Sequence, residues 1–192
     1  LRVLRYYTVH RALVRAKVAA LRQAQRLAQG NGQAEAHCAW RRYLDVALDC
    51  TRQRPPVLML THGFSGSGKT TLTQDLIERC GAIRLRADVE RKRLFGMAPL
   101  ARSDAAMKLR LYSDEANRAT QARLHERATV VLQSGYSVIL DATFLQRAQR
   151  DQARALAQRL CVAWLILDFQ ASPPLLRQRV QDRSTRGDDA SE

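Results

Sequence analysis

The sequence predicts an α/β fold of three layers, in which a parallel sheet lies between helices, preceded by an α-helical N-terminal segment. From residue 57 onward, short apolar runs alternate with longer stretches of helical periodicity. This alternation is typical of a parallel sheet covered by helices on both faces. A glycine-rich loop follows the first apolar run and leads directly into a helical stretch. Since ligands of such sheets bind at the carboxyl ends of the strands, we expect the functional residues at that edge.

A separate helical segment is expected over residues 1–52. Apolar residues recur at steps of three and four from 2 to 29, and a Gly-Asn-Gly run at 30–32 ends that pattern. A second helix is expected over 34–50. Two such helices bury little area alone, so we expect them to pack on the following domain or on a domain outside this sequence. The apolar residues that recur in the first helix are Leu4, Tyr7, Val14, Val18, Leu21, Ala24 and Ala28.

Paired prolines at 55 and 56 favour an extended linker. A second domain is therefore predicted over 53–192. Its strands are expected at Val57–Thr61, Ala82–Arg86, Tyr136–Asp141 and Val162–Asp168, and its helices at Lys69–Arg79, Val89–Phe95, Asp104–Ser134, Gln146–Leu160 and Pro173 to about Arg183.

The composition limits the classes of partner. No run of about 18 apolar residues occurs, so no membrane partner is expected. The four cysteines lack metal-ligand spacing, and free thiols indicate a reducing, cytoplasmic location. The net charge of +14 would suit nucleic acid. However, residues 1–54 carry 11 basic and 3 acidic groups and the rest carry 21 and 15, so a nucleic-acid partner is an alternative that is not favoured.

The residues 63–70 match the pattern G-x-x-x-x-G-K-[ST] without a mismatch. Glycines let successive backbone N–H groups point inward at phosphate oxygens, and the N-terminus of the following helix favours negative charge. Lys69 is expected to reach the β- and γ-phosphates of ATP, and the Thr70 hydroxyl to ligate Mg²⁺. The expected nucleotide-binding residues are Gly63, Ser65, Gly66, Ser67, Gly68, Lys69 and Thr70.

Two carboxylates follow other strands of the predicted sheet. Asp88 is interpreted either as a cap of the next helix or as the group that holds and deprotonates an acceptor hydroxyl. Arg91, one turn further on, would clamp an anionic part of the substrate or lie at the surface. Asp141 ends the run Val138–Leu140, which is a Walker B pattern. It would bind Mg²⁺ through water, hold Thr70 in place, or only cap the strand.

Arginines recur along the last predicted helix, at 177, 179, 183 and 186. Guanidinium groups suit a lid over a nucleotide because they neutralise the charge of a transferring phosphoryl group. We assign Arg183 and Arg186 as the catalytic lid groups. The alternative is an amphipathic helix with a basic outer face.

The loop 63–71, the segment Arg86-x-Asp88-x-x-Arg91-Lys92, the strand end 140–143 and the arginine-rich lid together resemble small P-loop kinases of the AAA-like ATP-binding group. That group is similar to polynucleotide kinase, zeta toxins and gluconate kinases. The resemblance implies that Asp88 serves the acceptor hydroxyl and that Arg91 contacts substrate. It also implies that Lys69, Thr70, Thr71 and Asp141 carry ATP and Mg²⁺. Such kinases usually have a fifth strand, so a C-terminal helix and strand are expected beyond this sequence unless they are dispensable.

The stretch from Tyr6 to Ala19 looks like the closing helix of an aminoglycoside-phosphotransferase-like domain. This resemblance implies an upstream domain of that kind in a longer protein. No catalytic motif of such a domain occurs in residues 1–56, so antibiotic phosphorylation is not transferred to this chain.

The leading functional hypothesis is an ATP-dependent kinase that transfers the γ-phosphate to a hydroxyl of a small molecule. One alternative is a regulatory module that binds or slowly hydrolyses ATP and controls a linked domain. The other alternative is a nucleic-acid 5′-hydroxyl kinase, which only the charge favours.

Overall fold

The computed structural model describes residues 3–29, 39–52, 54–99, 101 and 103–186. The chain divides into two compact units, Leu1–Arg54 and Pro55–Glu192. Among the described residues, no helix combines the length and the apolar character needed to cross a membrane. Each unit is described by itself below.

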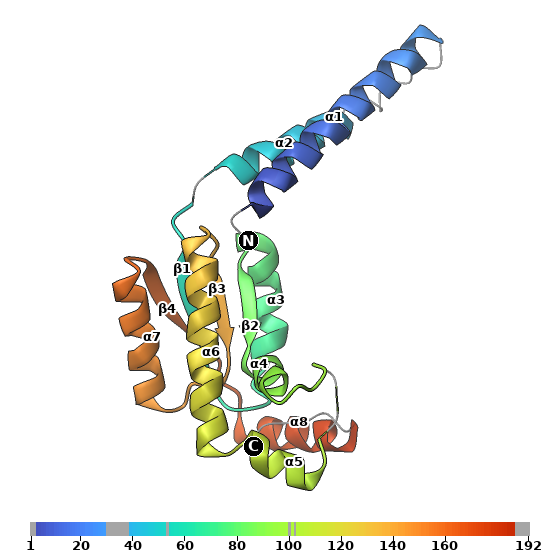
Figure 1. The fold of residues 1–192 in the computed structure, drawn as a ribbon. Helices are drawn as coiled ribbons and strands as arrows, with labels where there is room; N and C mark the ends of the chain where they lie inside the picture. The colour runs from blue at the N-terminus through green and yellow to red at the C-terminus, as the bar shows by residue number, and fades with distance from the viewer. Residues whose placement is uncertain (1–2, 30–38, 53, 100, 102, 187–192) are drawn as a thin grey trace. The chain divides into compact units, whose positions relative to one another are not determined.

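The N-terminal unit is a pair of helices, α1 (Leu4–Ala28) and α2 (Ala39–Thr51), that pack against each other (Figure 1). The part of the second predicted helix before residue 39 lies outside the described residues. The buried side chains are the small ones, Ala12 and Ala16 of α1 and Ala47 of α2. The first predicted helix is confirmed, and large residues of its apolar pattern, such as Val14 and Leu21, are exposed in this unit. Alanines allow the closest approach of two helices, so they form the contact.

The second unit is the predicted α/β fold, with a four-stranded parallel sheet in the order β2-β3-β1-β4 (Figure 1). The predicted strands are confirmed, with ends that differ by no more than two residues. The elements are β1 (Val57–His62), α3 (Lys69–Cys80), β2 (Ile83–Arg86), α4 (Ala87–Leu94), α5 (Ala105–Leu111), α6 (Asp114–Gln133), β3 (Val138–Asp141), α7 (Arg147–Arg159), β4 (Ala163–Asp168) and α8 (Pro173–Arg186).

Alternate side chains of the central strands fill two separate cores. Leu58 and Leu60 of β1 point to the face that α6 and α7 cover, together with buried residues of β3. Met59 and Ile139 point to the opposite face, where Leu76 of α3 packs against them. Neighbouring residues of β1 and β3 point to opposite faces of the sheet. Because helices cover both faces, these strands are continuous apolar runs in the sequence rather than alternating ones.

One predicted helix is wrong, because the stretch 104–134 forms two helices. Asp104 caps α5 by accepting a hydrogen bond from the Met107 backbone N at 2.7 Å. The chain then breaks at Tyr112, and Ser113 caps α6 by accepting from the Ala116 backbone N at 3.2 Å. A serine cap followed by two acidic residues is a helix-start signal. It outweighs the helical periodicity on both sides.

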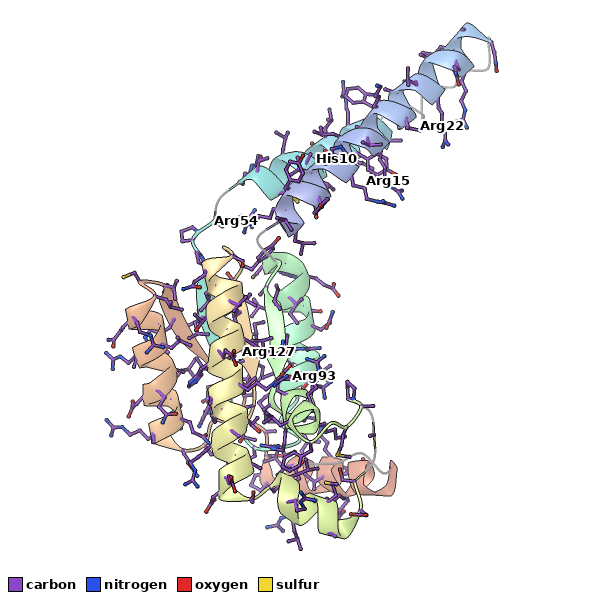
Figure 2. All side chains as sticks on the ribbon, viewed as in Figure 1. His10, Arg15, Arg22, Arg54, Arg93 and Arg127 are labelled. Carbon is purple, nitrogen blue, oxygen red and sulfur yellow. The ribbon has the colours of Figure 1, made fainter. Side chains whose placement is uncertain are left out.

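Helix α4 is fixed to α6 by a buried ion cluster. The Glu90 side chain is 2% exposed, and its carboxylate accepts hydrogen bonds from Arg93 and Arg123 and pairs with Arg127. Arg93 and Arg127 lie together where α4 meets α6 (Figure 2). Burial alone would raise the pKa of Glu90, but the hydrogen bonds from Arg123 and Arg93 bring the pKa below its ordinary value of 4.5. The cluster fixes the helix that carries Asp88.

We expect Glu90→Gln to lower the free energy of unfolding by about 3 kcal/mol, the lower end of the cost of breaking a buried ion pair, because the exposed arginines can turn to water. The measurement is urea denaturation near neutral pH. Glu126→Gln, at an exposed position of α6, is the matched control and should change little.

The pH dependence gives a second check on the same variant. A folded-state pKa below the unfolded value means that Glu90 stabilises the fold above the unfolded pKa and loses this effect as the pH falls through the folded pKa. The difference between the wild type and Glu90→Gln should therefore shrink in acid. A difference that stays constant would argue against the ion cluster as its cause.

Candidate functional site

A pocket of about 920 Å³ opens at the carboxyl edge of the sheet. Its walls come from the loop after β1, the start of α4, the α5–α6 region, and the segment after β3. Figure 1 shows α5 and α8 at this same end of the sheet. The position agrees with the expectation for parallel sheets.

The loop between β1 and α3 is folded around its own lysine. Lys69 is 8% exposed, and its Nζ donates to the carbonyl oxygens of Gly63 at 2.8 Å and Phe64 at 2.6 Å. Gly63 has φ +138°, and a Cβ there would lie 2.4 Å from the Phe169 carbonyl oxygen, so no other residue fits. Backbone N–H groups of such a loop, followed by a helix N-terminus, form a site for phosphate.

Thr70 and Asp141 meet at the floor of the pocket. The Thr70 hydroxyl donates to Asp141 Oδ2 at 2.9 Å, and Asp141 is buried. A second contact holds the threonine, since Arg84 donates to the Thr70 carbonyl oxygen at 2.6 Å. Mg²⁺ prefers oxygen ligands. The protein commonly supplies only a few of them, because substrate phosphates and water supply the others. This hydroxyl–carboxylate pair fits that donor set, and the described residues hold no cluster of three or more His, Cys, Asp or Glu.

Asp88 lies in the first turn of α4, and its carboxylate faces Arg86. Helix α4 begins at Ala87, so Asp88 is not the residue that caps it. Arg86 donates from Nε to Asp88 Oδ1 at 3.1 Å and from Nη2 to Oδ2 at 2.6 Å, and Oδ1 also accepts from the Val89 backbone N at 2.8 Å. Each carboxylate oxygen has two acceptor positions, so Oδ2 can still accept from a hydroxyl in the pocket.

Arg91 lines the pocket one helical turn from Asp88. Its guanidinium lies over the Tyr112 ring, 4.6 Å from the ring centroid, and its Nη2 donates to Asn117 Oδ1 at 3.1 Å. The break between α5 and α6 puts Tyr112 where it can make this contact. Arg91 is therefore held in place by groups from α6 and its preceding turn rather than extended at the surface.

Helix α8 reaches the loop through Arg179, which donates from Nη1 to the Gly66 carbonyl oxygen at 3.0 Å. A Cβ at Gly66 would be 3.5 Å from Arg179 Cβ, so the helix and the loop are in close contact. Arg183 and Arg186 belong to α8, but their side chains lie outside the described part of the chain. The side-chain positions of the two predicted lid arginines are therefore not described, whereas the side chain of Arg179 contacts the loop.

The ends of β1 and β4 are tied together beside the loop. His62 Nδ1 donates to Asp168 Oδ1 at 2.7 Å, and Gln170 donates to Asp168 Oδ2 at 2.8 Å. These hydrogen bonds, first that of His62, lower the pKa of Asp168 from its ordinary value. The Phe169 backbone N also donates to the His62 carbonyl oxygen at 2.8 Å. These contacts hold His62, the last residue before the loop, through both its side chain and its backbone.

The predicted site residues differ in where they lie. Ser65, Gly66, Gly68, Lys69, Thr70, Asp88, Arg91 and Asp141 line the pocket. Gly63 and Ser67 are behind it, where the Gly63 carbonyl oxygen and the Ser67 hydroxyl contact Lys69. Thr71 is exposed on α3 and is not among the described lining residues.

Four further residues belong to the site that the sequence-based assignment did not choose. Asn117 and Gln121 are one turn apart on α6 and line the pocket, and Arg86 and Arg179 hold Asp88 and the loop. Arg179 is part of the recurring arginine pattern and could have been chosen from it. The amides on α6 have no sequence signal, because only the fold brings α6 beside α4.

Comparison with known proteins places the second unit in a family. The model of a family described as AAA domain matches residues 58–192. An uncharacterized protein of Mycobacterium tuberculosis (strain ATCC 25618 / H37Rv) is 30% identical over 186 residues, which are 97% of this chain and 36% of that protein. The chain therefore spans about a third of the length of the curated relatives it matches.

Two solved structures show the same fold. A protein from Chloroflexus aurantiacus j-10-fl, which is described as a kinase by inference only, is 25% identical to this chain. The TM-score is 0.57, and the match covers 70% of this chain and 69% of that protein. The Mycobacterium tuberculosis APS kinase CysC in complex with AMPPNP and APS is 18% identical, with a TM-score of 0.51 and coverage of 72% and 83%. The second likeness shows the fold alone.

Proposed function

The chain belongs to the AAA domain family and has the fold of P-loop kinases, and from this premise we propose that it is an ATP-dependent phosphotransferase. It transfers the γ-phosphate of ATP to a hydroxyl of a small molecule, in the cytoplasm where ATP is available. The observation that carries the proposal is one pocket that joins the phosphate loop to Asp88 and Arg91. A site for a nucleotide alone would not need the opposite wall, which residues of α4, α5 and α6 form and which is called the second wall.

The transfer uses few protein groups. The acceptor oxygen attacks the γ-phosphorus, a new O–P bond forms, and the bond from that phosphorus to the β–γ bridging oxygen breaks, so that ADP leaves. Asp88 orients the hydroxyl and accepts its proton late in the reaction, and the proton then passes to water. Lys69 leaves its loop carbonyl partners to contact the β- and γ-phosphates, which neutralises the charge that develops there.

Mg²⁺ bound near Thr70 and Asp141 would neutralise charge on the β- and γ-phosphates. Thr70 supplies a hydroxyl oxygen, and Asp141 holds that hydroxyl in position through the 2.9 Å hydrogen bond. Arg84 fixes the backbone of the same residue. These contacts make the floor of the site rigid before substrate binds.

A lid function is proposed for Arg179 because its side chain lies against the phosphate loop. Arg179 already contacts the Gly66 carbonyl oxygen, so a small rotation of its side chain brings a guanidinium to phosphates in the loop. Arg183 and Arg186, which follow on the same helix, are proposed as further lid groups on the sequence pattern alone.

The test is a transfer assay with γ-labelled ATP and Mg²⁺ against sugars, nucleosides, oligonucleotides and aminoglycosides. We expect ADP to form in equal amount with one phosphorylated small molecule. Release of inorganic phosphate at the same rate with every acceptor and with none would reject the kinase. Transfer only to oligonucleotide ends would favour the 5′-hydroxyl kinase instead.

A regulatory ATP-binding module is the second candidate. The observation that favours it is the share of the relatives' length, 36%, that this chain covers. The remaining length has room for a domain that a nucleotide-dependent unit would control, such as the upstream phosphotransferase-like domain expected from the sequence. Slow hydrolysis without transfer in the assay above is the result that would select this candidate.

A further inference from the structure

The second wall of the pocket carries two polar atoms that have no hydrogen-bond partner among the described residues, Arg91 Nε and Gln121 Oε1. Both residues line the pocket. Buried donors and acceptors are nearly always paired in folded proteins. Two exceptions in the wall of one pocket indicate a ligand that supplies the missing partners.

The unpaired atom of Arg91 belongs to the edge of the guanidinium that binds oxyanions. The Nε and Nη2 groups of an arginine form a fork that can hold two oxygens of a carboxylate or phosphate. Arg86 uses this edge fully, with one hydrogen bond from each nitrogen to Asp88. On Arg91 only Nη2 is engaged, by Asn117 Oδ1. The Tyr112 ring and Asn117 position the guanidinium at this wall, and one half of its fork is filled.

The unpaired atom of Gln121 is an acceptor, and it needs a donor. Gln121 lies one turn from Asn117 on α6, so it is on the same side of the helix as the group that holds Arg91. A hydroxyl of a ligand can donate to Gln121 Oε1 while its neighbouring oxyanion accepts from Arg91 Nε. Both atoms are shielded from solvent in this structure, so the ligand reaches them when the two side chains turn toward the pocket.

The charge and size of the pocket define the ligand further. Arg91 and Lys108 line this wall, and its nearest carboxylate, Asp88, is paired with Arg86. The wall therefore favours negative charge. The volume of about 920 Å³ is near the upper end for small-molecule sites and includes the phosphate loop. That volume has room for a nucleotide and a compact acceptor together.

We propose that the acceptor is a small polyhydroxylated molecule that carries an oxyanion, either a carboxylate or a phosphate. The oxyanion completes the fork of Arg91, a hydroxyl donates to Gln121, and another hydroxyl lies at Asp88 for phosphorylation. This assignment rests on the proposed phosphotransferase function, and it adds the class of the substrate. The transfer step is the one given above, with the proton of the attacking hydroxyl taken by Asp88.

The experiment compares matched pairs of acceptors that differ in the oxyanion. The pairs are D-glycerate and glycerol, D-erythronate and erythritol, and D-ribose 5-phosphate and D-ribose. Binding to the ADP-bound protein is measured by calorimetric titration, and transfer from ATP by formation of ADP. We expect the charged member of at least one pair to bind, and to react, about 10- to 100-fold better. The first two pairs test recognition of a carboxylate, and the third pair tests recognition of a phosphate.

Two variants separate the roles of the unpaired atoms. Arg91→Lys keeps the charge but removes the fork, so the preference for the charged member should fall about tenfold. Gln121→Leu removes the acceptor but not the charge, so binding of both members should weaken by a similar factor and the preference should remain. The matched controls are Arg118→Lys and Gln133→Leu, at exposed positions of α6. Melting temperature and ADP affinity report whether each variant is folded.

The outcomes distinguish this inference from the proposed function. Equal binding of both members in every pair overturns the inference, as does failure of every charged probe to bind or a preference that Arg91→Lys leaves unchanged. Use of an oligonucleotide far above every small probe also overturns it. Preferential binding of a charged probe without any transfer supports the assigned ligand class and rejects the kinase. Transfer to neutral alcohols as fast as to charged ones rejects the ligand class and leaves the kinase in place.

Discussion

Replacement of Lys69 by alanine is expected to reduce ATP-dependent turnover by at least about 10²–10³-fold, as for loss of a group that neutralises developing charge. Lys69 is buried in the loop, and its Nζ contacts two of the loop carbonyl oxygens. The variant therefore removes both the proposed contact to the phosphates and an internal support of the loop. We expect ATP affinity to fall together with turnover.

The measurement is ADP formation at saturating ATP, with nucleotide binding followed by calorimetry. Lys17→Ala, at an exposed position of α1, is the control for loss of a positive charge and should behave as the wild type. Urea denaturation of each variant reports on folding. If Lys69→Ala kept the affinity and the turnover of the wild type, the nucleotide would have to bind elsewhere.

The second large effect is expected for Asp88→Asn, which should lower the rate of transfer by about 10²–10⁴-fold and leave ATP affinity near normal. Asparagine keeps the size of the side chain and an oxygen for the Val89 backbone N. It removes the charge that Arg86 pairs with and the capacity to take the acceptor proton. The rate of phosphate transfer should therefore fall, whereas the phosphate loop is not changed.

Single-turnover assays with ATP and the preferred acceptor measure this rate, and titration with ADP measures nucleotide affinity. The matched control is Asp75→Asn at an exposed position of α3, which should have no effect on either. Full activity of Asp88→Asn would leave Asp88 with a structural role only, as the partner of Arg86.

The architecture of the second unit could be predicted because its signals are local. The strands β1 and β3 are covered on both faces, so they read as unbroken apolar runs whose ends are easy to place. The break at Tyr112 and Ser113 was missed because periodicity continues on both sides of it. The contact between α1 and α2 could not be read from the size of the apolar residues, because small alanines form it.

The same distinction applies to the site. The phosphate loop is a continuous motif. The hydrogen bond between Thr70 and Asp141 follows because the loop after β1 and the end of β3 meet at one edge of the sheet. The contacts of Arg91 with Asn117 and of Arg179 with Gly66 join residues 26 and 113 positions apart. No local pattern encodes such pairs, since they depend on how α6 and α8 are placed.

The internal contacts of Lys69 have a consequence for the thermodynamics of nucleotide binding. A loop that is already closed around an ammonium group has a defined shape without any anion, so binding orders few additional backbone torsions. What changes is the set of oxygens around the ammonium group, from carbonyls to phosphates. The loop amides are not protected by the lysine and gain phosphate oxygens as acceptors, so their hydrogen exchange should slow when ADP is added although the loop keeps its shape.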